Sequence, residues 1–538
     1  MSFGSPFPTV DIPGVDVFDC LFGDLTPAEL DQVALSEDGS GTTSSYGELV
    51  AGIEEFAAGL AVRGIGAGDV VGLLCPNIPA FVVAFHGILR AGATVTPVNV
   101  LFTPAEIAKQ VNAAGASALV TVVAYLPQAR EAADLTGIDI DRLMVADGTA
   151  GYPSTSDLSA DAADADSAPR TTFDPATHLA VLPFSSGTTG NPKGVMLTHR
   201  NLVANVCQIE PLRWLHSGDV VLGILPFFHI YGMTVLLNAA LKARAHVVTM
   251  PRFELSAFLA NIEKFRVTHL FIAPPVAVAL AKDPRVDDYD LSSVRMIVSG
   301  AAPLDRELGE AVARRLGTTV TQGFGMTELS PVSHAVPADL GVAIAGQRAD
   351  ISSSGWPVAN TENKLIDPAT GAEISIPEQG LSVPGELLVR GPNVMAGYLH
   401  NPDESDAAVD ADGFLRTGDL ACVDAAGCIH IVDRIKELIK YKGYQVAPAE
   451  LEAVLLTHPS IADVAVVGIV DAAGEEIPAA FVVAGSGVEL RADEVIAFVA
   501  EQVAPYKKIR HVEFIDEVPK SAAGKILRKN LRHSIARV

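Results

Sequence analysis

The sequence predicts an α/β fold with a large N-terminal domain and a small, mobile α+β C-terminal domain. Within residues 69–299, short apolar runs alternate with helical segments, which is typical of parallel sheets covered by helices. From about Gly385 the strands look antiparallel, so the large domain should combine parallel-rich α/β subdomains with a β-rich lobe. A lysine-dense segment and a compact tail follow Asp433. We place the hinge there, which gives a large domain of residues 1–433 and a small domain of residues 434–538.

The elements of the large domain follow from their residue patterns, taken in chain order. Asp69–Cys75 is an apolar run fit for a buried strand, Ile78–Ala91 has a helical pattern, and Ala93–Val98 predicts the next strand. Thr103-Pro104-Ala105-Glu106 is a capping box with proline at the first helical position, so a helix begins there. Ala118–Val123 predicts another buried strand. Further strand signals lie at Leu179–Pro183, Thr268–Ala273 and Arg295–Ser299.

Two stretches need separate interpretation. Thr149–Pro169 is rich in Ala, Asp and Ser and predicts an acidic, exposed connection. Val220–Leu241 contains no Asp, Glu, Lys or Arg and is long enough to span a bilayer. It also contains Pro226, His229 and Asn238, so we interpret it as a buried strand, a turn and a core helix rather than a membrane span.

The C-terminal third changes in texture. Gly385–Arg390 and Gly427–Asp433 predict strands of the β-rich lobe. Four elements are expected in the tail, a helix, two strands and a second helix, at Ala449–Leu456, Val464–Val470, Ala479–Val483 and Arg491–Val503. This mixture of helices and strands is typical of a compact α+β domain.

The acidic composition restricts the partners of the protein. The formal net charge is −26 and the pI about 4.8, a field that repels nucleic acid and anionic membranes. The same field repels phosphorylated ligands, so any nucleotide site must be locally basic. The few clusters of Lys and Arg are therefore informative. Oligomeric state is left open between a monomer and a homodimer.

The cysteines and the termini bear on the compartment. The five cysteines are sparse, odd in number and without a Cys-x-x-Cys pair, which suits a reducing compartment. This spacing argues against a disulfide framework and against a zinc site, and burial is the expected role of each cysteine. The N-terminus has no signal-peptide pattern and the C-terminus no peroxisomal tripeptide, so a cytoplasmic protein is expected.

The strongest chemical signal is the segment Ser185–Gly194, which lies between two apolar strand signals. Its glycines let backbone N–H groups approach an anion, and its hydroxyls can donate to phosphate oxygens. It is not a Walker A loop, because no Gly-Lys-Ser/Thr follows a four-residue gap. The candidate phosphate-binding residues are Ser185, Ser186, Gly187, Thr188, Thr189, Gly190 and Lys193.

Two further segments suit a nucleotide. In Gln322–Glu328, Phe324 lies between two glycines and is free to stack on a base, Thr327 can donate to a phosphate, and Glu328 can hold Mg²⁺. In the second segment, Asp419 at a strand end can accept from ribose hydroxyls, with Arg434 downstream.

Lysines gather at both ends of the C-terminal tail. In so acidic a chain, lysines beside glycines indicate anion contacts, although a solvated surface is the alternative for any one of them. The candidates are Lys436, Lys440 and Lys442 beside Gly443 at one end, and Lys525 after Gly524 at the other.

Together these residues match a known pattern, and the chain resembles the acyl-adenylate-forming superfamily, within it the acid–CoA ligases similar to 4-coumarate–CoA ligase. The resemblance covers Tyr46 to Leu531, and its motifs occur in order. They are SSGTTGNPKGVMLTH (185–199), PFFHIYG (226–232), SGAAPL (299–304), QGFGMTE (322–328), GY (397–398), RTGD (416–419), DRIKELIKYKG (433–443) and PKSAAGKILR (519–528).

The resemblance implies a role for each matching residue and implies ATP, Mg²⁺ and CoA as cofactors. The loop from Ser185 to Lys193 would hold the pyrophosphate end of ATP. Ala301, Gln322, Gly323 and Phe324 would line the adenine, Thr327 would contact the α-phosphate, and Glu328 would hold Mg²⁺. Asp419 and Arg434 would bind ribose, and Lys525 would bridge the substrate carboxylate and the α-phosphate. His229 resembles the histidine beside that carboxylate. Lys442, Gly443 and Arg252 match positions that contact CoA, although Arg252 replaces the lysine that is frequent there.

The identity of the acid is the least determined feature. His229-Ile230-Tyr231-Gly232 lacks the aspartate with which amino-acid-adenylating relatives bind an α-amine, which disfavours an amino acid. The expected pocket residues are Ile230, Tyr231, Val235, Ser330, Pro331 and Val332 with Gly323, and most are apolar. A hydroxycinnamate-like aryl acid is favoured over a medium- or long-chain fatty acid. A stand-alone ligase that loads a carrier protein, a luciferase-like oxygenase and a non-enzymatic binder are the alternatives.

Overall fold

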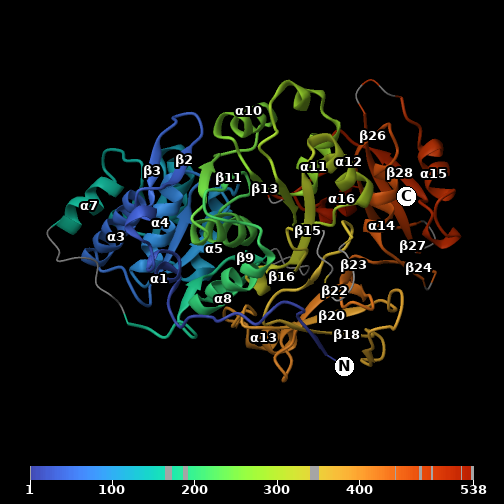
Figure 1. Ribbon diagram of the computed structural model, residues 1–538, viewed down its shortest axis with the longest axis horizontal. Helices are drawn as coiled ribbons and strands as arrows, with labels where there is room; N and C mark the ends of the chain where they lie inside the picture. The colour runs from blue at the N-terminus through green and yellow to red at the C-terminus, as the bar shows by residue number, and fades with distance from the viewer. Residues whose placement is uncertain are drawn as a thin grey trace.

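The computed structural model contains three large β-sheets with their helices, followed by a smaller C-terminal unit (Figure 1). The structure describes residues 2–163, 172–185, 192–339, 344, 350–442, 444–471, 475–485, 487, 489–522 and 524–534. The α/β fold predicted from the sequence is confirmed: two sheets are rich in parallel pairs, a third sheet is antiparallel, and the tail is α+β.

The first sheet has the order β21-β10-β8-β5-β4-β6-β7, with β9 paired to β10. Its strands are β4 (Val70–Leu74), β5 (Thr94–Pro97), β6 (Ala118–Thr121), β7 (Leu143–Val145), β8 (Leu179–Val181), β9 (Phe184–Ser185), β10 (Lys193–Thr198) and β21 (Gly397–Tyr398). The four pairs among β4 to β8 are parallel, as the continuous apolar runs predict.

The second sheet has the order β17-β16-β15-β14-β13-β11-β12-β2-β3. Its strands are β2 (Val33–Glu37), β3 (Thr43–Ser45), β11 (Val220–Gly223), β12 (His246–Thr249), β13 (His269–Ile272), β14 (Met296–Ser299), β15 (Thr319–Gly325), β16 (Val332–Ala335) and β17 (Trp356–Pro357). Strands β2 and β11 to β15 run parallel to one another, so the loops after β14 and β15 leave the same edge of the sheet.

Helices cover these two sheets, and the one capping box singled out in the sequence is present. Thr103 and Glu106 bond reciprocally at the start of α5, which ends at Gly115 in the left-handed conformation. The helices of this region are α1 (Val17–Phe22), α2 (Pro27–Leu30), α3 (Tyr46–Val62), α4 (Pro79–Arg90), α5 (Pro104–Ala114), α6 (Leu126–Thr136), α7 (Thr155–Ala163), α8 (His199–Ile209), α9 (Ala239–Lys242), α10 (Leu255–Phe265), α11 (Pro274–Lys282) and α12 (Arg306–Leu316).

The charge-free stretch at 220–241 folds as predicted. It forms β11, a turn, a buried π-helical segment over Tyr231–Asn238 and α9. Within the part of the chain that is described, no helix is both long enough and apolar enough to cross a bilayer.

The acidic connection predicted at Thr149–Pro169 is wrong in part. Residues 155–163 form the helix α7, and the Leu158 side chain is fully buried. A Cβ at Gly59 of α3 would lie 2.6 Å from the Leu158 Cβ, so the glycine lets the two helices approach closely. The prediction missed the helix because one leucine in an Ala- and Asp-rich stretch gives little periodic signal.

The β-rich lobe is an antiparallel sheet with the order β1-β18-β20-β22-β23 and with β19 paired to β18 (lower part of Figure 1). Its strands are β1 (Phe3–Gly4), β18 (Glu362–Ile366), β19 (Glu373–Ile374), β20 (Gly385–Arg390), β22 (Leu415–Val423) and β23 (Ile429–Arg434), and α13 (Pro402–Ala408) flanks it. The N-terminal strand β1 is therefore the edge strand of this sheet. It pairs with β18, which lies more than half of the chain length further along the sequence.

The C-terminal tail, red in Figure 1, has its own small cores. Its elements are β24 (Ile439–Tyr441), β25 (Tyr444–Val446), α14 (Pro448–Leu456), β26 (Ile461–Val470), β27 (Glu476–Ala484), α15 (Ala492–Ala500), β28 (His511–Phe514) and α16 (Arg528–Ser534). Strands β26 to β28 form a three-stranded sheet, and β24 and β25 a separate hairpin.

Candidate active site

Asp419 and Arg434 face each other across the hairpin of β22 and β23. Asp419 is 3% exposed, and its Oδ1 lies 3.3 Å from the Arg434 Nε. Burial raises the pKa of Asp419 to about 6, against the opposing effect of Arg434 and Lys525. Its Oδ2 is buried and has no hydrogen-bond partner within the described part of the chain. A buried acceptor without a donor is costly, so this oxygen fits a ligand hydroxyl such as that of a ribose.

Lys525 comes from the C-terminal tail, and its charge acts on the Asp419 carboxylate and lowers the pKa of that group. Gly524 before it has φ +81°, and a Cβ at Gly524 would lie 3.0 Å from the Ala273 Cβ at the start of α11. Burial lowers the pKa of Lys525 to about 8; the cations Arg434 and Arg528 act in the same direction, while Asp419 and Glu437 oppose them. The tail therefore presents this lysine to the large domain.

His229 is the third group of this cluster and comes from the turn after β11. Burial, and then the neighbouring charge of Lys525, lower the pKa of His229 to about 4, so the imidazole is neutral at pH 7. His229 Nδ1 accepts from the Tyr231 backbone N–H at 3.4 Å. The structure thus brings His229, Asp419 and Lys525 together from three distant parts of the sequence.

Glu328 lies on a 3₁₀ turn, Thr327–Leu329, that follows β15. It is buried, and its Oε1 accepts from the Tyr398 hydroxyl at 3.0 Å. Burial and the Glu328 charge raise the pKa of Tyr398, so the phenol remains a donor. A carboxylate fixed in this way, with half-buried Thr327 beside it, suits Mg²⁺ carried by phosphates, because this ion takes one or two carboxylates plus ligand oxygens.

Lys193 continues this group on its other side. Its Nζ pairs with Glu404 and lies 4.9 Å from the centroid of the Tyr398 ring. Ser185 is half-buried and pairs with Lys193 in the hairpin of β9 and β10. The predicted phosphate-loop residues between them lie outside the described residues, and so does Gly443; they are Ser186, Gly187, Thr188, Thr189 and Gly190.

The predicted adenine-lining residues lie on the loop after β14 and on β15. Ala301 is exposed with φ +70°, a left-handed conformation that is uncommon for a residue with a side chain. Gly323 and Phe324 are half-buried on β15. The Gln322 amide bonds to the Leu304 backbone N–H and carbonyl and to the Ile351 carbonyl. The Gln322 side chain therefore holds the 299–304 loop in place. Only the backbone of Gln322 remains available to line an adenine.

The six predicted acyl-pocket residues are buried. The Tyr231 hydroxyl donates to the Val298 carbonyl at 3.1 Å, and a Cβ at Gly300 would lie 2.7 Å from the Tyr231 ring. Ser330 donates to the Asn393 carbonyl at 2.8 Å. Val235, in contrast, lines a cavity of about 260 Å³ that none of the other five lines. Those five are Ile230, Tyr231, Ser330, Pro331 and Val332.

The tail lysines predicted to bind anions and the described residues predicted to contact CoA, Lys442 and Arg252, are exposed. Lys436, Lys440 and Lys442 are all exposed, and Lys442 has φ +48° in the turn between β24 and β25. Arg252 is also exposed, and its charge reaches Tyr125 in the N-terminal part of the chain. The structure thus gathers the predicted nucleotide residues and leaves the predicted CoA residues in solvent.

Two residues of the site were missed by sequence reasoning. Tyr398 joins Glu328 to Lys193, and Glu404 on α13 is the ionic partner of Lys193. The GY motif at 397–398 held a signal for Tyr398, because it is one of the motifs that carry the resemblance. Glu404 gave no signal, since an acid in the first turn of a helix is ordinary.

Comparison with protein families bears directly on this geometry. The model of the AMP-binding enzymes matches residues 27–399, and that of the AMP-binding enzyme C-terminal domain matches residues 450–525. This chain belongs to the AMP-binding enzyme family. The match confirms the resemblance to adenylate-forming enzymes that the motifs indicated.

Curated relatives of this AMP-binding enzyme are similar over nearly their whole length. It is 42% identical to 4-coumarate–CoA ligase 5 of Oryza sativa subsp. japonica, over 99% of this chain and 97% of the relative. It is 39% identical to 4-coumarate–CoA ligase 1 of Arabidopsis thaliana, over 99% and 95%.

Solved structures resemble the AMP-binding enzyme closely as well. A benzoate CoA ligase from Burkholderia xenovorans is 28% identical with a TM-score of 0.83, over 96% of this chain and 100% of the other. An anthranilate CoA ligase in complex with anthranoyl-AMP is 26% identical with a TM-score of 0.84, over 98% of each chain. The ATP-bound MatB from Rhodopseudomonas palustris is 28% identical, with a TM-score of 0.83 against 0.74 for its apo form; coverage is 96% and 98% in both comparisons.

Proposed function

We propose that this AMP-binding enzyme is an ATP-dependent acid–CoA ligase whose acid is hydroxycinnamate-like. It forms an acyl-adenylate and pyrophosphate, then transfers the acyl group to CoA and releases AMP. The observation that carries the proposal is the meeting of Lys525 with Asp419 and His229, because a cation from the tail is held at a buried ribose-type acceptor and beside a neutral imidazole.

In the first half-reaction, a carboxylate oxygen attacks the α-phosphorus and the bond to the β-phosphate oxygen breaks. Lys525 supplies positive charge to the carboxylate and the α-phosphate, where negative charge develops. Neutral His229 adds no cation of its own, so it can pack against the acyl carboxylate without competing with Lys525. Asp419 orients the ribose through its unpaired Oδ2.

Magnesium is part of the same proposal. Glu328 would hold the ion together with phosphate oxygens, and Tyr398 fixes the carboxylate through its hydroxyl. When bound, Mg²⁺ would neutralise phosphate charge and favour departure of pyrophosphate. Lys193 would hold the leaving pyrophosphate, with Glu404 as its partner when no phosphate is present.

The second half-reaction requires a different orientation of the tail. We place the domain boundary at Asp433, with residues 1–433 as the large domain and 434–538 as a mobile lid. Asp433 accepts from the Arg434 N–H at 2.7 Å and from the Ala449 N–H of α14 at 2.9 Å, so it links the last strand of the large domain to the tail. Rotation there would withdraw Lys525 and bring the exposed face of Lys440 and Lys442 toward the thiol path.

The orientation seen here suits adenylation. Lys525 is in place, and the superposition is better on the ATP-bound form of MatB than on its apo form. Two-state closure of this kind is a recognised way to assemble one site for two successive steps.

An aryl acid is supported by the relatives and by the pocket residues. The curated relatives include several 4-coumarate–CoA ligases, and the solved structures include benzoate and anthranilate CoA ligases. Tyr231 and its apolar neighbours Ile230 and Val235 are buried, and apolar surroundings of this kind suit an aromatic ring.

A panel of acids tests the proposal. Purified protein is incubated with ATP and 4-coumaric, benzoic, octanoic or palmitic acid, with and without CoA, and AMP and acyl-CoA are measured. CoA-dependent AMP release with 4-coumaric acid is expected. Preference for octanoic or palmitic acid would overturn the aryl substrate, and AMP release that needs a carrier protein instead of CoA would overturn the acceptor.

A further inference from the structure

Four residues with metal-binding side chains share one face of the hairpin that joins β22 to β23. Cys422 pairs directly with His430, and the Asp424 N–H donates to the Cys428 carbonyl at 3.0 Å, which makes Asp424 and Cys428 the last pair before the turn. Residues directly opposite each other in an antiparallel pair point to the same face, and so do residues two apart along a strand. The pattern Cys-x-Asp-x₃-Cys-x-His therefore gathers its four side chains on one side of the ribbon.

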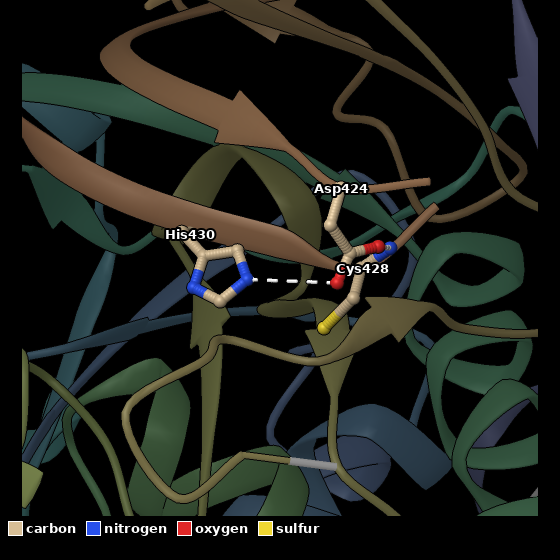
Figure 2. A group of neighbouring side chains, drawn as sticks. All are labelled: Asp424, Cys428 and His430. Carbon is tan, nitrogen blue, oxygen red and sulfur yellow. Dashed lines mark hydrogen bonds and ion pairs between the residues drawn. The ribbon is translucent and has the colours of Figure 1, made fainter. Parts of the chain in front are cut away.

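Three of these side chains meet (Figure 2). One ligand atom each from Asp424, Cys428 and His430 lies within 4.8 Å of the other two, and the His430 Nε2 is 3.7 Å from the Asp424 Oδ2. Atoms bound to one tetrahedral zinc lie about 3.3–3.8 Å apart, given Zn–N, Zn–O and Zn–S bonds of about 2.0–2.3 Å. The cluster is thus within a small side-chain adjustment of metal geometry. Asp424 and Cys428 are buried and His430 is half-buried, which leaves a path for an ion.

The surroundings hold the cluster in place. The Asp424 Oδ1 accepts from the Ala426 and Cys428 N–H groups at 2.9 Å each, so the carboxylate is fixed with Oδ2 turned to His430. The Gly355 amide and the Ser353 hydroxyl contact the Cys428 sulfur and hold it in position. Trp356 Nε1 donates to the Ala426 carbonyl at 3.0 Å and ties the turn to β17.

We propose that Asp424, Cys428 and His430 form a structural zinc site. A thiolate, an imidazole and a carboxylate are the ligand types that zinc accepts, and a soft sulfur disfavours Mg²⁺ and Ca²⁺. Cys422, opposite His430 on the same face, is the residue from which a fourth protein ligand would come. This proposal departs from the sequence prediction, which argued against a zinc site because the chain has no Cys-x-x-Cys pair; here the ligands come from both sides of a tight turn.

The site has a structural purpose rather than a catalytic one. It lies at the turn end of the hairpin, roughly 15 Å along β22 from Asp419 at about 3.3 Å per residue. The opposite end of the same hairpin carries Arg434 and Asp433. A zinc ion would therefore stabilise the turn of the β22–β23 hairpin. The other end of this hairpin carries the candidate ribose site and the proposed hinge.

Metal content and cobalt spectra test the proposal. Full-length protein without a histidine tag is assayed for zinc by mass spectrometry, stripped with a zinc-selective chelator and titrated with Co²⁺. The expected results are one zinc per chain, a sulfur-to-cobalt charge-transfer band, and a Tm that the chelator lowers. Absence of both zinc and the cobalt band would overturn the proposal.

Variants separate a built site from adventitious binding. Cys428→Ser and His430→Gln should each lose the metal and its effect on Tm, whereas Cys207→Ser, which removes a buried thiol on α8, should keep both. Pyrophosphate exchange checks that the variants are folded. A cobalt–thiolate band retained in Cys428→Ser would contradict the assignment, and the His430→Gln result stands on its own should Cys428→Ser fail to fold.

Discussion

One lysine of the C-terminal tail is partly buried, whereas two others on the same tail are exposed to solvent. Lys525 is held against the large domain, where burial lowers its pKa to about 8. Lys440 and Lys442, on the hairpin of β24 and β25, are exposed to solvent. The difference is what the proposed alternation of the tail requires: in this orientation the lysine proposed for adenylation is partly buried, and the lysines proposed for thioester formation are in solvent. If Lys525 and the exposed lysines serve different half-reactions, changes to them should affect adenylation and thioester formation separately.

The largest effect is expected for Lys525→Ala. Removing the cation that stabilises the developing charge should lower the rate of adenylation by about 10²–10³-fold. Thioester formation from preformed acyl-adenylate should change little. Pyrophosphate exchange and single-turnover thioester formation measure the two steps.

Lys520→Ala is the matched control, because Lys520 lies in the same loop but pairs with Asp463 on β26. It should retain adenylation. An equal loss in both variants would mean that the loop, and not the Lys525 charge, determines the rate.

Asp433→Pro should give the converse pattern. Proline restricts φ at the proposed pivot, so rotation of the tail should be impaired. Misplacement of reacting groups costs up to about 10²-fold, and this loss should fall on thioester formation with adenylation retained. Parallel loss of both steps, in the assays used for Lys525→Ala, would remove Asp433 from the hinge.

The pH dependence of adenylation should reflect the ionisation of Lys525 and Asp419, two groups of the site whose pKa is shifted by burial. Lys525 must be cationic, so kcat/KM for ATP should fall above pH 8, about tenfold for each further unit. Asp419 must be ionised, so the same quantity should fall below pH 6. Lys525→Arg keeps its charge at all these pH values and should abolish the alkaline limb alone. A limb that persists in this variant belongs to another group.

The smallest effect is expected for Lys442→Ala. An exposed lysine that contacts a phosphate contributes up to about 1 kcal/mol, so the KM for CoA should rise about two- to fivefold with adenylation unchanged. Lys508→Ala, on another part of the tail, is the comparison. Equal effects of the two changes on KM would show that general charge, rather than a CoA contact, is being measured.

The sequence predicted the elements whose signals are local. The buried strands, the capping box at Thr103 and the order of the motifs needed only hydrophobic period and short-range chemistry. The α7 helix escaped because its single anchor, Leu158, is meaningful only beside Gly59 of α3. Contacts of this kind join residues about a hundred positions apart, and no local pattern encodes them.

The same limit applies to the site. Asp419, Arg434 and Lys525 were found from their motifs, yet the bond from Tyr398 to Glu328 depends on how β21 joins the first sheet. Gln322 was expected at the adenine, but its amide is committed to Leu304 and Ile351. The motif named the residue, but it carried no information on the direction of the side chain.

Gly524 touches Ala273 where the tail meets the large domain, and a side chain there would lie 3.0 Å from its Cβ. The close contact between the tail and the large domain at this point therefore depends on the absence of a side chain at residue 524. Gly524 also has φ +81°, a backbone conformation that residues with a side chain rarely adopt. Any substitution there should therefore disfavour this orientation of the tail, and so shorten the time that the enzyme spends in it, without altering a group proposed to touch substrate.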